Sequence, residues 1–244
     1  MLGGTTEATQ LATALAKTGY DALFSYAGRT NRPVAQPLPT RVGGFGGADG
    51  LADFLKDDGI THVIDATHPF AAQMSTNAIT ACGNTEIPLV AFERPPWQAE
   101  LGDNWLSVSD ITAASLELPD HPARVFLAIG KQHIDAFAAR PEHFYLLRLV
   151  DTPTQALPLP NAHAVIARGP FDEAGDLALL QEHNINIIVA KNAGGQGAAA
   201  KLAAARALGL KVIMIDRPHI PARRVLGTVG DVMTWLDHST DLGV

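Results

Sequence analysis

The sequence has a single cysteine, Cys82, among its 244 residues. One cysteine cannot form an intrachain disulfide, so a small secreted domain held together by disulfides is excluded. Long apolar runs are also missing. The longest stretch without a charged residue, 66–85, contains His68, Gln73 and Asn77, and we therefore expect no membrane helix. No basic-then-apolar leader opens the chain. These absences favour a cytoplasmic protein.

The chain has no excess of positive charge: 18 Lys and Arg stand against 25 Asp and Glu, a net charge of −7. Nonspecific binding to nucleic acid or to a membrane surface is therefore disfavoured. Hydrophobic residues make up 47% of the chain, which excludes an intrinsically disordered protein. The charge is divided unevenly, with −8 in residues 1–120 and +1 in residues 121–244. An anionic substrate would favour the second half.

The two halves of the sequence match each other at a spacing of 126 residues. Matched pairs are Gly4 and Gly130, Gly43 and Gly169, Phe45 and Phe171, Leu51 and Leu177, and Val63 and Val189. Further on, the spacing shortens to 123, where Glu-Arg-Pro at 93–95 matches Asp-Arg-Pro at 216–218. Matches that occur in order, with similar local patterns, indicate an internal duplication.

Each half alternates short apolar runs with amphipathic segments. Helices are predicted at 5–17, 48–58, 70–81, 110–117, 171–183, 198–208 and 231–238. Strands are predicted at 22–27, 60–65, 88–92, 125–129, 145–150, 164–167, 187–190 and 212–215. This alternation is typical of α/β folds with parallel sheets covered on both faces. We expect two doubly wound, Rossmann-like domains, 1–120 and 121–244, with an interdomain cleft.

The first strand of the first half is short. Only Met1 and Leu2 precede Gly3, whereas a full strand, 124–129, precedes Gly130. We therefore expect that leading residues are missing from the first strand.

Gly3, Gly4, Thr5 and Thr6 lie where the first strand turns into the first helix. Glycines there allow a phosphate to approach the backbone, and the helix N-terminus offers free N–H groups. The spacing meets the Rossmann fingerprint only in part. A tight turn with a threonine cap is the structural alternative.

Ser25 and Arg29 follow the second predicted strand, where an enzyme that uses NAD would carry an acidic residue. An arginine in place of that acid favours a 2′-phosphate and hence NADP; an ordinary exposed arginine is the alternative. Gly43 and Gly44 belong to the most glycine-dense stretch, 41–47, which indicates close approach to a ligand or a mobile hinge.

Ala66, Thr67 and His68 follow a predicted buried strand and open a helix. Ligands of doubly wound sheets bind at such strand ends. His68 could donate a proton or hydrogen-bond a ligand, or serve only the structure.

Basic and small residues follow four predicted strands of the second half. Together they could hold a polycarboxylate, or they could form a solvated rim. The candidate substrate-binding residues are Lys131, Arg168, Lys191, Asn192, Gly194 and Arg217. The chain has no Tyr-x-x-x-Lys pair, no phosphate-binding P-loop motif and no zinc-ligand spacing, so no metal is expected.

Several motifs resemble the precorrin-6A/cobalt-precorrin-6A reductase family of cobalamin biosynthesis. They are Gly-Gly-Thr-x-Glu-Ala at 3–8, Arg-Val-Gly-Gly-Phe-Gly-Gly at 41–47, Asp-Ala-Thr-His-Pro-Phe-Ala at 65–71, Glu-Arg-Pro-x-Trp at 93–97, Arg-Gly-Pro-Phe at 168–171, Lys-Asn-x-Gly-Gly at 191–195 and Arg-Pro at 217–218. The resemblance covers nearly the whole chain. One departure is Ala193, where the family's Lys-Asn-Ser-Gly-Gly has a serine.

The resemblance implies an NADPH-dependent oxidoreductase that reduces one carbon–carbon double bond of the precorrin-6A macrocycle to give precorrin-6B. It implies a tetrapyrrole substrate as the small-molecule partner, held in the cleft between the domains. Two alternatives stay open: a non-catalytic module that binds a dinucleotide or tetrapyrrole, and a methyltransferase that uses S-adenosylmethionine. The sequence leaves the oligomeric state undetermined.

Overall fold

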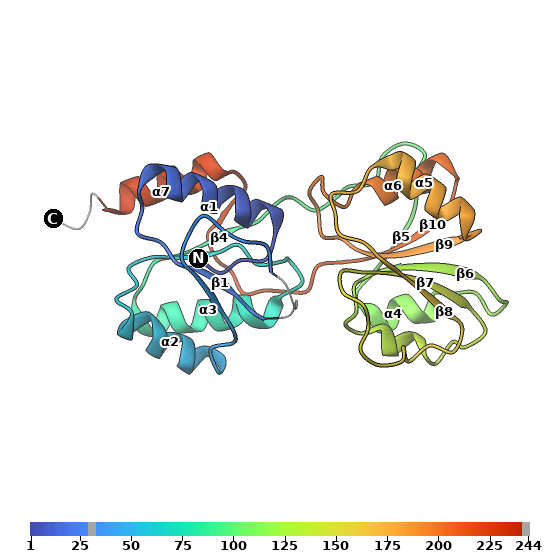
Figure 1. Cartoon of the computed structure of the whole chain (residues 1–244), viewed down its shortest axis with the longest axis horizontal. Coiled ribbons are helices and arrows are strands. Elements are labelled where there is room, and N and C mark those ends of the chain that lie inside the picture. Colours follow the sequence, from blue (N-terminus) through green and yellow to red (C-terminus); the bar gives the residue numbers. More distant parts are fainter. Residues whose placement is uncertain (29–32, 241–244) are drawn as a thin grey trace. The chain divides into compact units, whose positions relative to one another are not determined.

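A computed structural model describes residues 1–28 and 33–240 and divides the chain into two compact units (Figure 1). Unit 1 comprises residues 1–95 and 219–244, and unit 2 comprises residues 96–218. Each unit is an α/β structure with a parallel sheet, which confirms the predicted fold class.

The sheet of unit 1 is built around a very short first strand. Its named strands are β1 (Phe24–Tyr26), β2 (Thr40–Val42), β3 (Val63–Asp65), β4 (Leu89–Phe92) and β11 (Val225–Leu226). Leu2 forms parallel bridges to Ser25 of β1 and to Asp65 of β3, so it joins β2-β1 to β3-β4-β11. Met1 and Leu2 therefore occupy the central strand position of this sheet.

The sheet of unit 2 has six parallel strands in the order β5-β10-β9-β6-β7-β8. Their bounds are β5 Asn104–Val108, β6 Arg124–Ala128, β7 Phe144–Leu149, β8 Ala162–Ile166, β9 Ile187–Lys191 and β10 Lys211–Ile215. The central strands β6, β9 and β10 are nearly continuous apolar runs because both of their faces are buried.

The sheets of the two units have the same strand order, but the halves of the sequence exchange one edge strand each. β5, from the first half of the sequence, pairs with β10 of unit 2, and β11, from the second half, pairs with β4 of unit 1. The expected boundary between residues 120 and 121 is therefore wrong. It lies inside unit 2, and the chain divides instead after Pro95 and again after Pro218. Strands β2, β5 and β11 were not predicted from the sequence.

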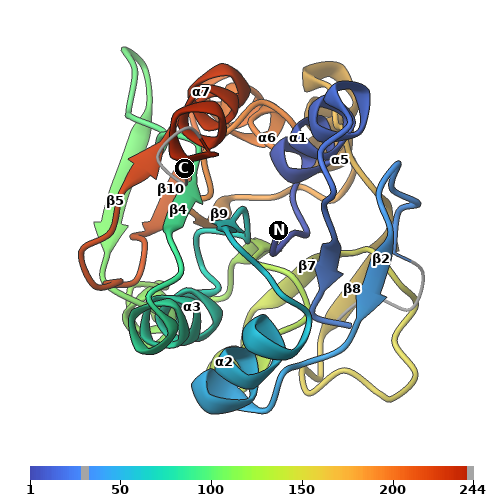
Figure 2. The same ribbon diagram turned by 90° about the vertical axis from the view of Figure 1, so that its left-hand side faces the viewer.

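Helices cover both faces of each sheet. In unit 1, α1 (Thr6–Thr18) packs with α7 (Val229–Thr240) on one face, and α2 (Gly47–Asp57) packs with α3 (Ala72–Thr85) on the other (Figure 2). In unit 2, α5 (Glu173–Glu182) packs with α6 (Ala200–Ala207), and α4 (Ile111–Leu116) contacts the 3₁₀ helix η1 (Ile134–Phe137). No helix in the described ranges is long and apolar enough to cross a membrane.

The first helix shows how the local sequence sets an element. Thr5 caps its N-terminus by accepting a hydrogen bond from the N–H of Ala8, and Gly19 ends it in the left-handed conformation. Ala8, Leu11, Ala12 and Leu15 are buried on one face. They pack against Phe24 of β1, in the core between the sheet and the helices α1 and α7.

Candidate active site at the carboxyl ends of the strands

The first turn of unit 1 brings the predicted cofactor residues of two loops together. The hydroxyl of Thr5 donates to the carbonyl oxygen of Ala66 at 3.1 Å, and the N–H of Ala66 donates to Leu2 at 2.8 Å. The end of β3 is thereby fixed beside the N-terminus of α1. Thr6 is exposed on the first turn of that helix.

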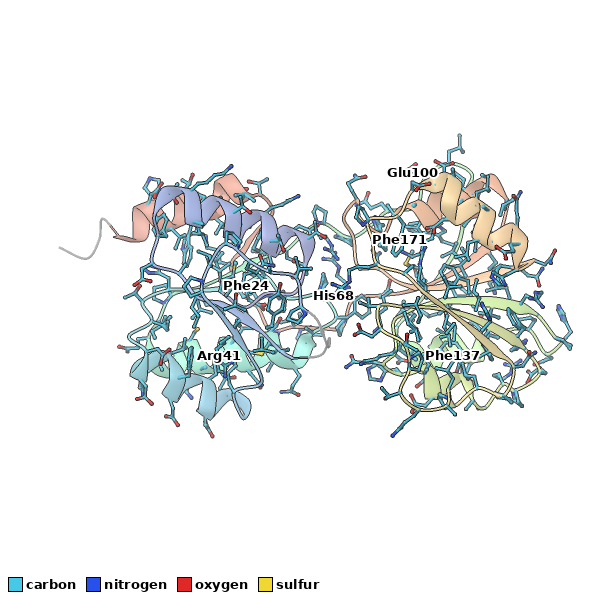
Figure 3. All side chains as sticks on the ribbon, in the orientation of Figure 1. Phe24, Arg41, His68, Glu100, Phe137 and Phe171 are labelled. Carbon is cyan, nitrogen blue, oxygen red and sulfur yellow. The ribbon has the colours of Figure 1, made fainter. Side chains whose placement is uncertain are left out.

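The two glycines of this turn have different roles. A Cβ at Gly3 would lie 2.1 Å from the Phe24 ring, so only glycine fits against this side chain (Figure 3 labels Phe24). Gly4 has a φ of +135°, and a Cβ there would meet nothing within 4 Å. Open space in front of Gly4 allows a ligand to approach the backbone closely.

The loop after β3 is held by the buried carboxylate of Asp65. One of its oxygens accepts hydrogen bonds from the N–H of Thr67 at 3.1 Å and from the hydroxyl of Thr67 at 2.6 Å. The Nδ1 atom of His68 accepts from the N–H of Phe70 at 3.2 Å. Since Nδ1 is the acceptor, the neutral His68 ring carries its proton on Nε2.

A small pocket opens at this edge of unit 1. Its lining residues are Thr5, Glu7, Thr67, Pro69, Phe92, Glu93 and Arg94. Glu7, in the first turn of α1, forms an ion pair with Arg94, and Glu93 forms one with Arg223. No role was predicted for Arg94 from the sequence, although it belongs to the motif at 93–97.

Ser25, Gly43 and Gly44 are brought together by a residue that the sequence analysis did not single out. Arg41 donates to the hydroxyl of Ser25 at 3.3 Å and to the carbonyl oxygens of Gly43 at 3.0 Å and Gly44 at 3.1 Å. The central carbon of its guanidinium, Cζ, lies 3.9 Å from the centre of the Phe45 ring (Figure 3 labels Arg41). Arg29 lies outside the described residues.

In unit 2 the predicted substrate residues follow four strands of one parallel sheet and thus share an edge. Lys131 follows β6, Arg168 follows β8, Lys191 ends β9 and Asn192 follows it, and Arg217 follows β10. Arg217 donates to the carbonyl oxygens of Asn192 at 3.0 Å and Ala193 at 3.2 Å. The arginine thus fixes the loop that contains Gly194. Lys131 and Arg168 are exposed on loops of their own.

Trp97 and Lys201 also shape this edge of unit 2. Trp97 donates through its ring N–H to Gly195 at 2.9 Å. The buried ammonium of Lys201 lies 4.6 Å from the centre of the Trp97 ring and donates to the carbonyl oxygen of Ala198. A buried cation over an aromatic ring stabilises the position of both.

The loop that bears Arg168 is supported from the sheet. Arg148 of β7 forms an ion pair with the buried Asp176 of α5, and its guanidinium lies 3.7 Å from the centre of the Phe171 ring (Figure 3 labels Phe171). The N–H of Phe171 donates to Gly197 at 3.4 Å. Within residues 1–28 and 33–240, no group of three or more His, Cys, Asp or Glu side chains could hold a metal ion.

Comparison with known proteins gives a consistent result. The family described as Precorrin-6x reductase CbiJ/CobK matches residues 1–237. A precorrin-6A reductase of Rhodobacter capsulatus is 63% identical over 246 residues, covering 100% of this chain and 98% of that protein. A precorrin-6A reductase of Sinorhizobium is 46% identical, covering 98% and 92%. A cobalt-precorrin-6A reductase of Priestia megaterium is 30% identical, covering 98% of both.

A solved structure agrees with these relatives. The structure titled CobK precorrin-6A reductase matches with a TM-score of 0.95 and 63% identity, and the match covers 97% of this chain and 94% of that one.

Proposed function

The chain belongs to the precorrin-6x reductase CbiJ/CobK family, and we propose that it reduces a carbon–carbon double bond of precorrin-6A with NADPH to give precorrin-6B in cobalamin biosynthesis. The 63% and 46% identical relatives are named precorrin-6A reductases, whereas a 30% identical one is named for the cobalt form. We therefore assign the cobalt-free macrocycle as the substrate.

The observation that carries the proposal is the first turn of unit 1. The Thr5 hydroxyl joins it to Ala66, and the space in front of Gly4 is open, as a pyrophosphate bound at a helix N-terminus requires. Gly3, Gly4, Thr5 and Thr6 would hold the pyrophosphate, Ser25 and Arg29 would lie near the 2′-phosphate, and Gly43, Gly44, Ala66 and Thr67 would flank the rest of the cofactor.

NADPH supplies the hydride, which forms a new C–H bond at one carbon of the double bond. A proton must reach the conjugated system at its other end so that the charge balances. His68 is our candidate for the donor: its imidazolium form would give a proton to the substrate and take one up again from solvent. The rest of the unit orients the reactants and excludes water.

The residues at the strand ends of unit 2 would bind the macrocycle. Precorrin-6A carries several carboxylates, which arginine and lysine bind through charge-assisted hydrogen bonds. Arg217 already fixes the loop at Asn192 and Ala193. Lys131, Arg168 and Lys191 would then contact the carboxylates, with Asn192 and Gly194 giving the loop its shape.

The test is turnover of purified protein with NADPH and precorrin-6A, followed by loss of reduced nicotinamide and by mass spectrometry of the product. The proposal expects NADPH oxidation only with the macrocycle present and a product heavier by two hydrogen atoms. Binding of both molecules without turnover would support a non-catalytic module instead. Thermal stabilisation by S-adenosylmethionine in preference to NADPH would support a methyltransferase.

A further inference from the structure

Two equivalent phenylalanines, one in each unit, have different charged groups around them. Phe45 and Phe171 match at the spacing of 126 residues, and each has an arginine over its ring, Arg41 at 3.9 Å and Arg148 at 3.7 Å. In unit 2 the buried carboxylate of Asp176 neutralises Arg148. The position that matches Asp176 in unit 1 is Gly50, where a Cβ would lie 1.9 Å from the carbonyl oxygen of Phe45.

Arg41 therefore has no carboxylate partner within the ranges that the structure describes. Its guanidinium instead donates to the carbonyl oxygens of Gly43 and Gly44, at 3.0 and 3.1 Å. Both peptide bonds that follow these carbonyls are trans, so the N–H groups of Gly44 and Phe45 point away from the guanidinium. Neither N–H has an acceptor among residues 1–28 and 33–240.

The space at this loop is open. A Cβ at Gly43, whose φ is +137°, or at Gly44 would meet nothing within 4 Å. Two successive backbone N–H groups beside open space form a concave donor pair that suits the oxygens of a phosphate. A positive charge behind the same peptides increases their preference for an anion.

The strand order locates this donor pair relative to the cofactor. Ser25 pairs with Leu2 on one side and with Arg41 on the other, so β1 lies between the first turn and β2. In doubly wound folds the pyrophosphate lies at the first turn and the adenosine ribose at the end of the second strand. The loop after the next strand outward then lies on the side of the ribose 2′ position.

We propose that Arg41 is a positioning residue that turns the N–H groups of Gly44 and Phe45 toward the 2′-phosphate and thereby sets the preference for NADPH over NADH. The inference rests on the proposed function, because it assumes that unit 1 binds a dinucleotide. It assigns to Arg41 a role that was predicted from the sequence only for Ser25 and Arg29.

The test measures binding of 2′,5′-ADP and 5′-AMP by calorimetry, together with NADPH and NADH, to the full chain. The unsubstituted protein is expected to prefer the 2′-phosphorylated member of each pair. Arg41→Gln should reduce that preference roughly 10- to 100-fold, as expected when hydrogen bonds to a charged group are lost. Arg41→Lys keeps the charge but cannot hold both carbonyls, so it should restore only part of the preference.

Two further variants keep the inference falsifiable. Lys56→Gln removes the same charge from the exposed face of α2 and should leave the preference unchanged. Gly44→Ala places a methyl group in open space without a positive φ, so it should fold and still weaken 2′,5′-ADP selectively.

Equal weakening of 2′,5′-ADP and 5′-AMP in Arg41→Gln would overturn the inference, since a purely structural role predicts that result. Full preference in Arg41→Lys would overturn it as well, because charge alone would then suffice. If the unsubstituted protein bound neither dinucleotide, the proposed function itself would fail. These outcomes are distinguishable.

Discussion

Trp97 and Asn192 exchange two hydrogen bonds. The backbone N–H of Trp97 donates to the side-chain oxygen of Asn192 at 2.7 Å, and the side-chain amide of Asn192 donates to the carbonyl oxygen of Trp97 at 3.0 Å. The pair connects the segment that enters unit 2 to the loop that follows β9. Arg217 holds the backbone of the same loop from the segment that leaves the unit. The loop after β9, which we propose binds the substrate, is thus held by residues near the first and the last positions of unit 2.

Asn192→Ala removes both of these hydrogen bonds and leaves the partly buried backbone groups of Trp97 unsatisfied. We expect the free energy of unfolding to fall by about 1–3 kcal/mol, measured by urea denaturation. The Michaelis constant for the macrocycle should rise more than kcat falls. Asn104→Ala, at an exposed position of β5, is the control and should change neither quantity. Unchanged stability in Asn192→Ala would contradict the role given to the pair.

Thr5→Val keeps the shape of the side chain but removes the helix cap and the hydrogen bond to Ala66. The expected loss of stability is about 1–2 kcal/mol, with weaker binding of NADPH because the first turn is no longer fixed beside β3. Thr5→Ser retains the hydroxyl and should recover most of both. Calorimetric binding and thermal unfolding of the two variants give the comparison. A serine variant as impaired as the valine variant would show that the hydroxyl is not responsible.

Gly3→Ala is expected to be destabilising although the change is only one methyl group. The new Cβ would lie 2.1 Å from the ring of the fully buried Phe24, and the core would have to shift. Overpacking of this kind costs about 1–3 kcal/mol. Combining Gly3→Ala with Phe24→Leu should cost less than the two single changes added together, as a double-mutant cycle by denaturation would reveal. Additive costs would argue against direct contact.

Asp176→Asn removes the carboxylate beside Arg148 and leaves a guanidinium that is 10% exposed without its partner. We expect a loss of about 3–5 kcal/mol, since an uncompensated buried charge is costly. The double replacement Arg148→Met with Asp176→Leu removes both charges and should be more stable than the single variant. Thermal unfolding of the three proteins tests this order. A double variant less stable than Asp176→Asn would mean that packing of Arg148 on Phe171 dominates.

The buried thiol of Cys82 is expected to make the free energy of unfolding fall as pH rises in the alkaline range. Burial, with a further contribution from the negative charge of Asp65, raises the pKa of the Cys82 thiol from 9.0 to about 11. Between these values the unfolded chain loses the thiol proton while the folded chain keeps it, so the folded state binds more protons and its stability falls as pH rises.

The comparison for this effect is Cys82→Ala, which lacks the thiol. Denaturation of both proteins at pH 8 and near pH 11 should show a steeper loss for the unsubstituted chain, superimposed on a constant offset from the smaller side chain. Parallel losses in the two proteins would exclude Cys82 as the cause.

The elements of the fold follow closely from the local sequence. The apolar positions of α1 recur with helical spacing between Thr5 and Gly19, and the run at 187–191 is a strand buried on both faces. The glycines at 3–4 lie where the short first strand turns into the first helix. Each of these features depends on residues close in sequence, so periodicity and turn chemistry were sufficient to predict them.

The exchange of β5 and β11 could not be predicted in this way. Both halves present a similar sheet edge, at β4 and at β10, and the local pattern of 104–108 is equally compatible with either. The contacts of Arg41, Trp97 and Lys201 could not be predicted from the sequence for the same reason. They join segments that are distant in sequence and meet only in the folded chain.

The sequence by itself thus determined the helices, the strands other than β2, β5 and β11, and the chemical groups that follow those predicted strands. The tertiary structure alone decided which sheet β5 and β11 complete, and that Arg148 has a carboxylate partner whereas Arg41 has none among residues 1–28 and 33–240. The physical reason is that hydrogen bonding and packing between segments are set by their proximity after folding. Arg148 is neutralised by Asp176, whereas Arg41, over the equivalent ring, is bound to the glycine loop.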